Sequence, residues 1–226
     1  MMKRFIFSIF LLPLLLASPQ TKAQGIMLTP KWTAQAQFTG YYVADKLGFY
    51  KEEGIDVCVQ HPAISESSFS FMEKGRAPVV IMNLSYAFME RLAGARVVNV
   101  MQTSQENSLM LISHSPLKGE ESLRNQKIAV WNHLSQKLLD RLAEHYALKQ
   151  VEWIRFNSGV NVFLSGAADP CLVGSYNEYL QLSEYGMNVD SIYSIRLADY
   201  GYNLPEDGLY VTEEFYNQYP DCLLYT

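Results

Sequence analysis

The sequence is short of several residue types that mark particular protein classes. Its 226 residues include 13 glycines and 9 prolines, too few for a collagen-like, low-complexity or fully disordered chain. Lys and Arg number 18 against 23 Asp and Glu, which gives a net charge of −5. This lack of basic excess argues against a partner nucleic acid, because a nucleic-acid-binding protein presents a basic face to the phosphates. The length suits one large domain or two lobes of roughly 100 residues, and 49 % of the chain is apolar.

Cysteine is scarce as well, and so are the short motifs of common enzyme classes. Cys58, Cys171 and Cys222 are an odd number, so at least one is unpaired within the chain. Cys58 lies in the strand-like run 55–59, and we expect a small buried residue there rather than half of a disulfide. The chain has no GxSxG elbow, P-loop, HExxH or metal-spaced Cys/His cluster. We therefore expect no catalytic residue of these kinds, no metal and no cofactor.

The first 23 residues are typical of a secretory signal peptide. Lys3 and Arg4 are followed by the apolar stretch 5–17 and by small residues before Ala23. The apolar stretch is too short to cross about 30 Å of hydrocarbon, although an uncleaved anchor remains an alternative. We predict cleavage near Ala23 and export of the mature chain to the periplasm.

Strand and helix patterns alternate along the chain. Strands are expected at 27–32, 55–60, 79–82, 97–101, 109–113, 127–131, 151–156 and 171–173, and helices at 38–47, 65–73, 86–92, 134–146, 160–164 and 176–184. This alternation predicts an α/β fold of parallel-rich sheets flanked by helices.

Two breaks in the pattern predict two lobes. They lie near residues 103–107 and 197–207, where Pro205 and Gly208 interrupt the alternation. We expect a signal peptide at 1–23, a first lobe from 24–104 and 203–226, and a second lobe from 105–202. A chain that leaves one lobe and later returns to it leaves a cleft between the lobes, where ligands commonly bind.

An aromatic, amide-rich junction follows the first expected strand. Residues 31–57 read KWTAQAQFTGYYVADKLGFYKEEGIDV, with Trp32 at the end of the strand, Gln37 in the loop, and Tyr41 and Tyr42 on the first helical turn. Trp and Tyr rings stack on flat ligands, and a Gln amide offers both a donor and an acceptor. The alternative is a core Trp with interface tyrosines.

This junction resembles the opening signature of the family that joins periplasmic thiamine-pyrimidine-precursor-binding proteins to yeast-type hydroxymethylpyrimidine phosphate synthases. The pattern is Trp, then Gln-Phe-x-Gly-x-Tyr-x-Ala, then Gly-Phe-Tyr-x-x-x-Gly-hydrophobic-Asp-Val, found here at Trp32, 37–44 and 48–57. Residues 158–179 and 200–216 resemble two later blocks. The resemblance covers about 27–220 and implies the two-lobed type II periplasmic binding protein fold.

The family that the sequence resembles contains both enzymes and binding proteins, and the sequence favours one of the two. Its synthase branch carries a Cys-rich return segment and uses a Lys and a His to hold pyridoxal phosphate, whereas residues 203–208 here contain no Cys. We expect His61 to be a solvated loop residue and the protein to be a binder, not an enzyme. Members of the family usually continue well past the return strand, so we also expect a C-terminally truncated or frameshifted first lobe.

The expected ligand site draws on both lobes. From the first lobe we expect Trp32, Tyr41 and Tyr42 to stack on the ligand and Gln37 to contact a ring edge. Asn83 and Ser85 follow an expected strand at its carboxyl end, which also suits a turn or a helix cap.

From the second lobe, Asn132 and His133 precede an expected helix whose first amides suit an anionic group, with a plain cap as the alternative for Asn132. Tyr176, Asn177 and Glu178 match the family's Asn-Glu position. Glu178 is expected to accept hydrogen bonds from an exocyclic amine, or else to act only as a charge at the helix N-terminus.

We therefore predict the solute-binding component of an ABC importer, with a small heteroaromatic, thiamine-precursor-like pyrimidine as its ligand and a permease of the inner membrane as its partner. The first alternative is a ligand-sensing periplasmic domain of a membrane-bound histidine kinase. The further alternatives are a hydroxymethylpyrimidine phosphate synthase-like enzyme and a sulfonate, taurine or nitrate binder.

Overall fold

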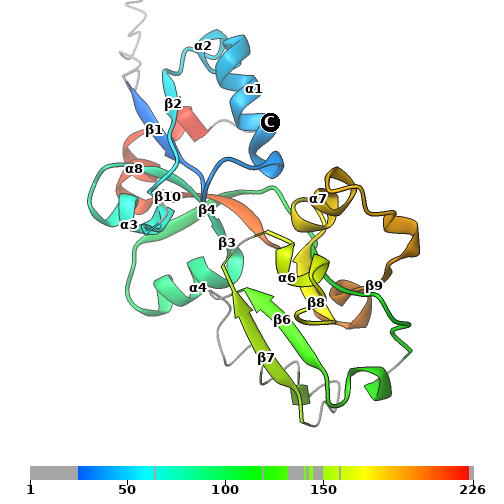
Figure 1. Ribbon diagram of the computed structural model, residues 1–226. Helices are drawn as coiled ribbons and strands as arrows, with labels where there is room; N and C mark the ends of the chain where they lie inside the picture. Colours follow the sequence, from blue (N-terminus) through cyan, green and yellow to red (C-terminus); the bar gives the residue numbers. More distant parts are fainter. Residues whose placement is uncertain are drawn as a thin grey trace, which may run out of the picture.

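The computed structural model describes residues 25–63, 65–118, 120–131, 140, 143–144, 150–157 and 159–223 (Figure 1). The expected signal peptide and most of the expected helix 134–146 lie outside these residues. The strands are β1 (Ile26–Thr29), β2 (Val57–Val59), β3 (Val79–Asn83), β4 (Val97–Gln102), β5 (Leu109–Ser113), β6 (Lys127–Trp131), β7 (Glu152–Phe156), β8 (Cys171–Gly174), β9 (Tyr193–Arg196) and β10 (Asp207–Thr212).

Helices flank these strands. The α-helices are α1 (Thr39–Leu47), α2 (Phe49–Glu52), α3 (Ser68–Glu73), α4 (Leu84–Leu92), α6 (Asn161–Leu164), α7 (Glu178–Glu184) and α8 (Glu213–Gln218). Short 3-10 helices span Ala36–Phe38, Glu120–Leu123, Val189–Ser191, Leu197–Tyr200 and Pro220–Leu223. Among the described residues, no helix has both the length and the apolar character needed to cross a membrane.

The first lobe is built on a sheet with the strand order β2-β1-β3-β10-β4. β1 pairs in parallel with β2 and β3, whereas β10 runs antiparallel to β3 and β4. Because side chains alternate across a strand, β3 contributes Val80 and Met82 to one apolar cluster and Val79 and Ile81 to another. Phe38, at the start of α1, is completely buried in the second of these clusters.

The second lobe is built on a sheet with the order β7-β6-β8-β5-β9. β6 pairs in parallel with β7 and β8, and β5 runs antiparallel to β8 and β9. One face packs around the fully buried Phe163 and Leu182, and the other around Ile128 and Val130. Each lobe thus has its own sheet and its own core.

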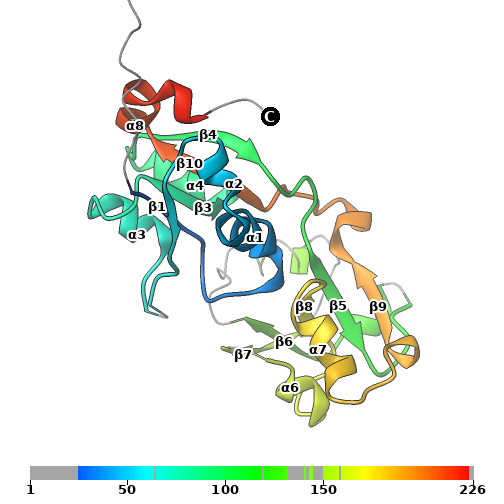
Figure 2. The same cartoon turned by 90° about the horizontal axis from the view of Figure 1, so that it is seen from above.

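Two segments connect the lobes, one after β4 and one before β10 (Figure 2). They are joined to each other at both ends. The carbonyl oxygen of Asp207 accepts hydrogen bonds from the backbone nitrogens of Thr103 and Ser104 at 2.9 and 3.0 Å. Further along, the backbone nitrogen of Asn107 donates to Oδ1 of Asn203 at 3.0 Å. The connection is therefore a hydrogen-bonded pair of segments rather than two independent linkers.

The predicted α/β fold is confirmed, with element positions close to those expected from the sequence. β6 coincides with the predicted strand, and α1 ends where Gly48 adopts a left-handed conformation with φ 82°, which glycine tolerates best. Both sheets are mixed, because β10 and β5 run against their neighbours. The prediction for Cys58 was wrong, since this residue is exposed while Val57 and Val59 of the same strand are half-buried.

Candidate functional site

A cavity of about 160 Å³ lies between the two lobes, at the carboxyl end of β3 and beside the connecting segments. It is lined by Trp32, Asn83, Ser85, Asn107, Ser108, Leu109, Trp131, Tyr176, Leu197, Tyr202, Leu204, Pro205 and Glu206. Pockets for drug-sized ligands measure about 300–1,000 Å³, so this cavity suits a smaller molecule such as a single aromatic ring. Four aromatic side chains, from Trp32, Trp131, Tyr176 and Tyr202, give it two indole and two phenol rings.

Trp32 has an unusual backbone for so large a residue. Its φ is 58°, in the left-handed region, and a bulky side chain seldom adopts that conformation unless its surroundings enforce it. The ring is 37 % exposed, and Nζ of Lys31 lies 4.2 Å from the ring centroid. A strained, partly exposed indole at the edge of a cavity is characteristic of a ligand contact rather than of a core residue.

His61 holds this backbone in place. Its Nδ1 lies 2.7 Å from the carbonyl oxygen of Trp32, and its Nε2 lies 2.6 Å from the Tyr42 hydroxyl. Because a carbonyl oxygen only accepts, Nδ1 donates to Trp32, and in the neutral ring Nε2 accepts from Tyr42. His61 lies in a loop, as expected, but it is half-buried and both of its ring nitrogens contact protein groups.

The carboxylate of Glu178 accepts three hydrogen bonds from groups of the protein. Oε1 accepts from Nε1 of Trp131 at 3.1 Å and from Nδ2 of Asn177 at 3.0 Å, and Oε2 accepts from the backbone nitrogen of Gly174 at 3.0 Å. The residue is 5 % exposed and does not line the cavity. In this geometry Glu178 orients the Trp131 indole, which does line it.

A buried ion pair underlies the first-lobe side. Lys31, 6 % exposed, pairs with the carboxylate of Asp207, also 6 % exposed, and donates a hydrogen bond to Oδ1 of Asn83. Asn83 occupies the N-cap position of α4, but its side chain makes no capping bond, because its oxygen serves Lys31. The pair joins the end of β1 to the start of β10.

A second carboxyl group, that of Glu206, belongs to the cavity itself. Its Oε2 accepts a hydrogen bond from Oγ of Ser108 at 2.9 Å, and both residues line the cavity. Burial raises the pKa of Glu206 above its ordinary value, with Lys31 and Ser108 opposing the shift. Burial also raises the pKa of the nearby Tyr176, and Glu206 adds to that shift.

The structure places the sequence-predicted residues unevenly. Trp32, Asn83, Ser85 and Tyr176 line the cavity, whereas Gln37, Tyr41, Tyr42, Asn177 and Glu178 do not. Asn132 and His133 lie outside the described residues. Gln37 donates to Oε1 of Gln35 at 2.8 Å, and Tyr41 packs against the first-lobe core.

Sequence reasoning missed Ser108, Trp131, Tyr202 and Glu206 as cavity residues. Trp131 could have been found, since it ends an expected strand at its carboxyl edge, where ligands of α/β proteins gather. Glu206 follows Pro205 in a segment whose interrupted pattern predicts a passage between the lobes. No local pattern distinguishes it from other acidic residues of the chain.

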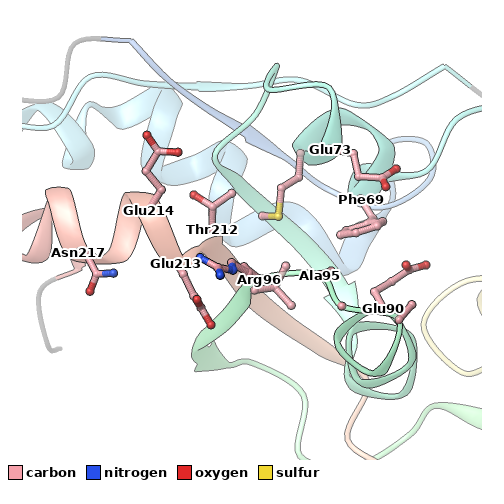
Figure 3. Close-up of a pocket in the computed structure, with 13 residues that line it drawn as sticks. Phe69, Glu73, Glu90, Ala95, Arg96, Thr212, Glu213, Glu214 and Asn217 are labelled. Atoms are coloured by element: carbon pink, nitrogen blue, oxygen red, sulfur yellow. The ribbon is translucent and has the colours of Figure 1, made fainter.

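A larger cavity, of about 610 Å³, lies within the first lobe, among α3, α4, the start of β4 and α8. Figure 3 shows carboxylates of Glu73, Glu90, Glu213 and Glu214 around it, with Phe69 and Arg96. Glu213 is already paired with Arg91 at 3.1 Å. All the residues that line this larger cavity belong to the first lobe, so relative movement of the lobes does not open or close it. The inter-lobe cavity is therefore the stronger candidate.

Comparison with known proteins identifies the family of this chain. A family model described as "NMT1/THI5 like" matches residues 35–223. The chain is 26 % identical to the riboflavin-binding protein RibY of Chloroflexus aurantiacus over 90 % of its length and 60 % of that protein's. It is 19 % identical to the 4-amino-5-hydroxymethyl-2-methylpyrimidine phosphate synthase THI13 of Saccharomyces cerevisiae, over 68 % of this chain and 47 % of that one. The chain thus spans about half the length of several curated relatives.

Solved structures share the two-lobed fold. The periplasmic aliphatic sulphonate binding protein SsuA of Escherichia coli superimposes with a TM-score of 0.65 at 14 % identity, over 87 % of this chain and 68 % of that chain. The ligand-binding component of an ABC-type import system from Staphylococcus aureus gives 0.63 at 11 % identity, over 88 % and 70 %. The fold is therefore the two-lobed α/β fold of periplasmic binding proteins, and the chain belongs to the NMT1/THI5-like family.

Proposed function

We propose that this protein is the exported, periplasmic substrate-binding component of an ABC importer and that it carries a small, single-ring heteroaromatic molecule of the thiamine-precursor pyrimidine type. The observation that carries the proposal is the inter-lobe cavity of about 160 Å³, which Trp32 and Trp131 line from opposite lobes. Indoles on both sides suit a flat ring, because each aromatic contact contributes about 0.5–1.5 kcal/mol beyond burial.

The mechanism follows from the connection between the lobes. A ligand that touches both lobes favours the closed arrangement by the difference between its contacts in the closed and the open form. The paired connecting segments, joined through the Asp207 carbonyl oxygen and Asn107, act as the hinge. A permease that recognises the closed form would then receive only loaded protein.

Binding rather than catalysis is favoured by the lining residues that the structure describes. They include neither Lys nor His, the residue types that the family resemblance assigns to pyridoxal phosphate in the synthase branch. The hydroxyl of Ser108 is bonded to a carboxylate, and no imidazole among the described lining residues activates it as a nucleophile. These features support a binding protein.

The small cavity also separates possible ligands. Riboflavin, the ligand named for one relative, has three fused rings and a ribityl chain, so it would need a larger space than about 160 Å³. Sulphonates, named for a structural neighbour, are anions without an aromatic ring. Neither matches the aromatic lining as well as one pyrimidine ring does.

The test is a titration of the purified chain with 4-amino-5-hydroxymethyl-2-methylpyrimidine, riboflavin, ethanesulfonate and nitrate, followed by calorimetry and thermal melting. A ligand at 100 times its Kd stabilises the protein by about 2.7 kcal/mol. We expect this response with the pyrimidine alone, lost in Trp32→Ala and kept in Phe88→Ala, which removes an aromatic ring that is 60 % exposed on α4 and outside the cavity. A response to riboflavin or an anion instead would overturn the proposed ligand, and turnover of the pyrimidine would overturn the binding role.

A further inference from the structure

The charges that line the inter-lobe cavity are unbalanced. Among its described lining residues, Glu206 supplies the one carboxylate, and none is Lys, Arg or His. The nearest buried cation is Lys31, but its charge is committed to Asp207 and its hydrogen bonding to Asn83. Among the described residues, the wall of the cavity therefore offers a negatively charged hydrogen-bond acceptor and no uncommitted cation.

Glu206 is held firmly in that position. Its backbone carbonyl oxygen accepts from the nitrogen of Leu84, the first residue of α4, at 2.9 Å. Its neighbour Asp207 is fixed by the ion pair with Lys31. Its side-chain oxygen Oε2 is bonded to Ser108 on the other connecting segment. Both connecting segments thus fix the carboxyl group at the hinge between the lobes.

Among the described residues, the carboxylates of Glu178 and Glu206 are satisfied to different degrees. Three donors from the protein reach the carboxylate of Glu178, whereas one residue, Ser108, supplies the hydrogen bonds to that of Glu206. A carboxylate has roughly four acceptor positions, and leaving them empty in a buried place is costly. A ligand that brings donors would fill the remaining positions on Glu206, while one that brings a second negative charge would be repelled.

We infer that Glu206 is the specificity-determining residue of the cleft: it accepts a hydrogen bond from the exocyclic amino group of the bound ring, and it excludes sulfonates and other anions. This inference rests on the proposed function, because it assumes a ring ligand in the inter-lobe cavity. It assigns to Glu206 the role that the sequence suggested for Glu178. Ser108 is the positioning residue that orients the carboxylate.

The experiment compares two probes that differ at one group, 4-amino-5-hydroxymethyl-2-methylpyrimidine and its 4-oxo counterpart, with ethanesulfonate as the anion. Wild type should prefer the amino compound by about tenfold or more, as expected for a hydrogen bond to a charged group. Glu206→Gln should reduce this preference to about threefold or less, since an amide can pair with either probe. Glu106→Gln, which alters an exposed carboxylate on the connecting segment that carries Ser108 and is paired with Arg196 at 2.7 Å, should leave it unchanged.

A second variant guards against misfolding of the first. Ser108→Ala keeps the carboxylate but removes its Oγ partner, and it should weaken binding of the amino compound more than that of the oxo compound. An amino preference that survives in Glu206→Gln, or equal binding of both pyrimidines by wild type, would overturn the inference and leave the proposed function standing. Failure of folded wild type to bind either pyrimidine would overturn the proposed function and the inference together, as would tight binding of ethanesulfonate.

Discussion

The imidazole of His61 donates a hydrogen bond from Nδ1 to the backbone carbonyl oxygen of Trp32 over 2.7 Å. It thereby fixes a tryptophan whose φ is 58°. His61 itself is held from the other side by the Tyr42 hydroxyl on α1. This chain of contacts accounts for the position of the exposed indole.

The strained backbone at Trp32 predicts that a Gly variant is more stable than an Ala variant, the reverse of the usual order. Trp32→Ala and Trp32→Gly remove the same ring, so both should weaken pyrimidine binding by about tenfold or more. Because a left-handed backbone costs a non-glycine residue about 1–2 kcal/mol, we expect the Gly variant to be more stable than the Ala variant by about 1 kcal/mol. Urea unfolding of the ligand-free proteins measures the difference.

A matched pair at an ordinary helical position supplies the control. Ala and Gly variants of Phe88, in the interior of α4, should show the usual order, with Gly less stable by about 1 kcal/mol. If Trp32→Gly were also the less stable of its pair, the backbone at that position would not be strained.

The buried ion pair between Lys31 and Asp207 predicts a strong coupling. Lys31→Met leaves the carboxylate of Asp207 without its partner, and breaking a buried pair in this way costs about 3–5 kcal/mol. Adding Asp207→Asn removes the uncompensated charge, so the double variant should recover part of the loss. The four proteins of this cycle are compared by urea unfolding at pH 7. Additive losses would mean that the two groups do not interact in solution.

Glu178→Gln should destabilise the second lobe although it keeps the shape of the side chain. Its amide nitrogen must face one of the donors from Trp131, Asn177 or Gly174, which leaves a buried donor unpaired at a cost of about 1–3 kcal/mol. Thermal melting should show the loss, and the fluorescence of Trp131 should shift as its Nε1 loses an acceptor. Unchanged stability and an unchanged spectrum would contradict these three hydrogen bonds.

Glu206 predicts the opposite effect on stability, with a defined pH dependence. Burial raises the pKa of its carboxyl group above the ordinary value of 4.5, and the nearby Asp207 adds to this while Lys31 and Ser108 oppose it. The folded state therefore binds this proton more tightly than the unfolded state, and stability is lost as pH rises from 4.5 through the raised pKa. Glu206→Gln removes this loss.

The ligand-free Glu206→Gln protein should accordingly gain stability relative to wild type as pH increases from 4 to 8. Urea unfolding of both proteins across that range measures the gain. Glu106→Gln, at an exposed ion pair, should show no such trend. A difference between wild type and Glu206→Gln that is independent of pH would contradict the raised pKa. A gain in stability together with a loss of amino preference would be the trade-off expected at a binding site.

Local chemistry explains why the elements could be predicted. Gly48 ends α1 because it accepts the left-handed conformation, and the unbroken apolar run of Val79 to Met82 is typical of a strand buried on both faces, as β3 is. The prediction for Cys58 was wrong because β2 lies at the edge of its sheet. The strand-like run 55–59 predicts a small buried residue at Cys58, but Val57 and Val59 pack on the core and Cys58, between them, is exposed.

The site was less predictable because separate parts of the chain assemble it. Trp32, Asn83, Trp131 and Glu206 are far apart in sequence, and their meeting depends on how β10 returns to the first sheet. Short-range patterns found the residues at strand ends, such as Trp32 and Asn83. They carried no information on which carboxyl group, that of Glu178 or that of Glu206, would be enclosed by donors and which would face the cavity.

The position of β10 between β3 and β4 also fixes an order of events as the chain emerges from the ribosome or crosses a membrane, N-terminus first. The five strands of the second sheet lie in one continuous stretch from β5 to β9, so they are all present before β10 appears. Until then, β3 and β4 each expose an unpaired edge, the feature that makes nascent sheets prone to aggregate. The first lobe therefore begins to form first and is completed last. Before β10 joins its sheet, the chain is at the stage where a chaperone would protect it from aggregation.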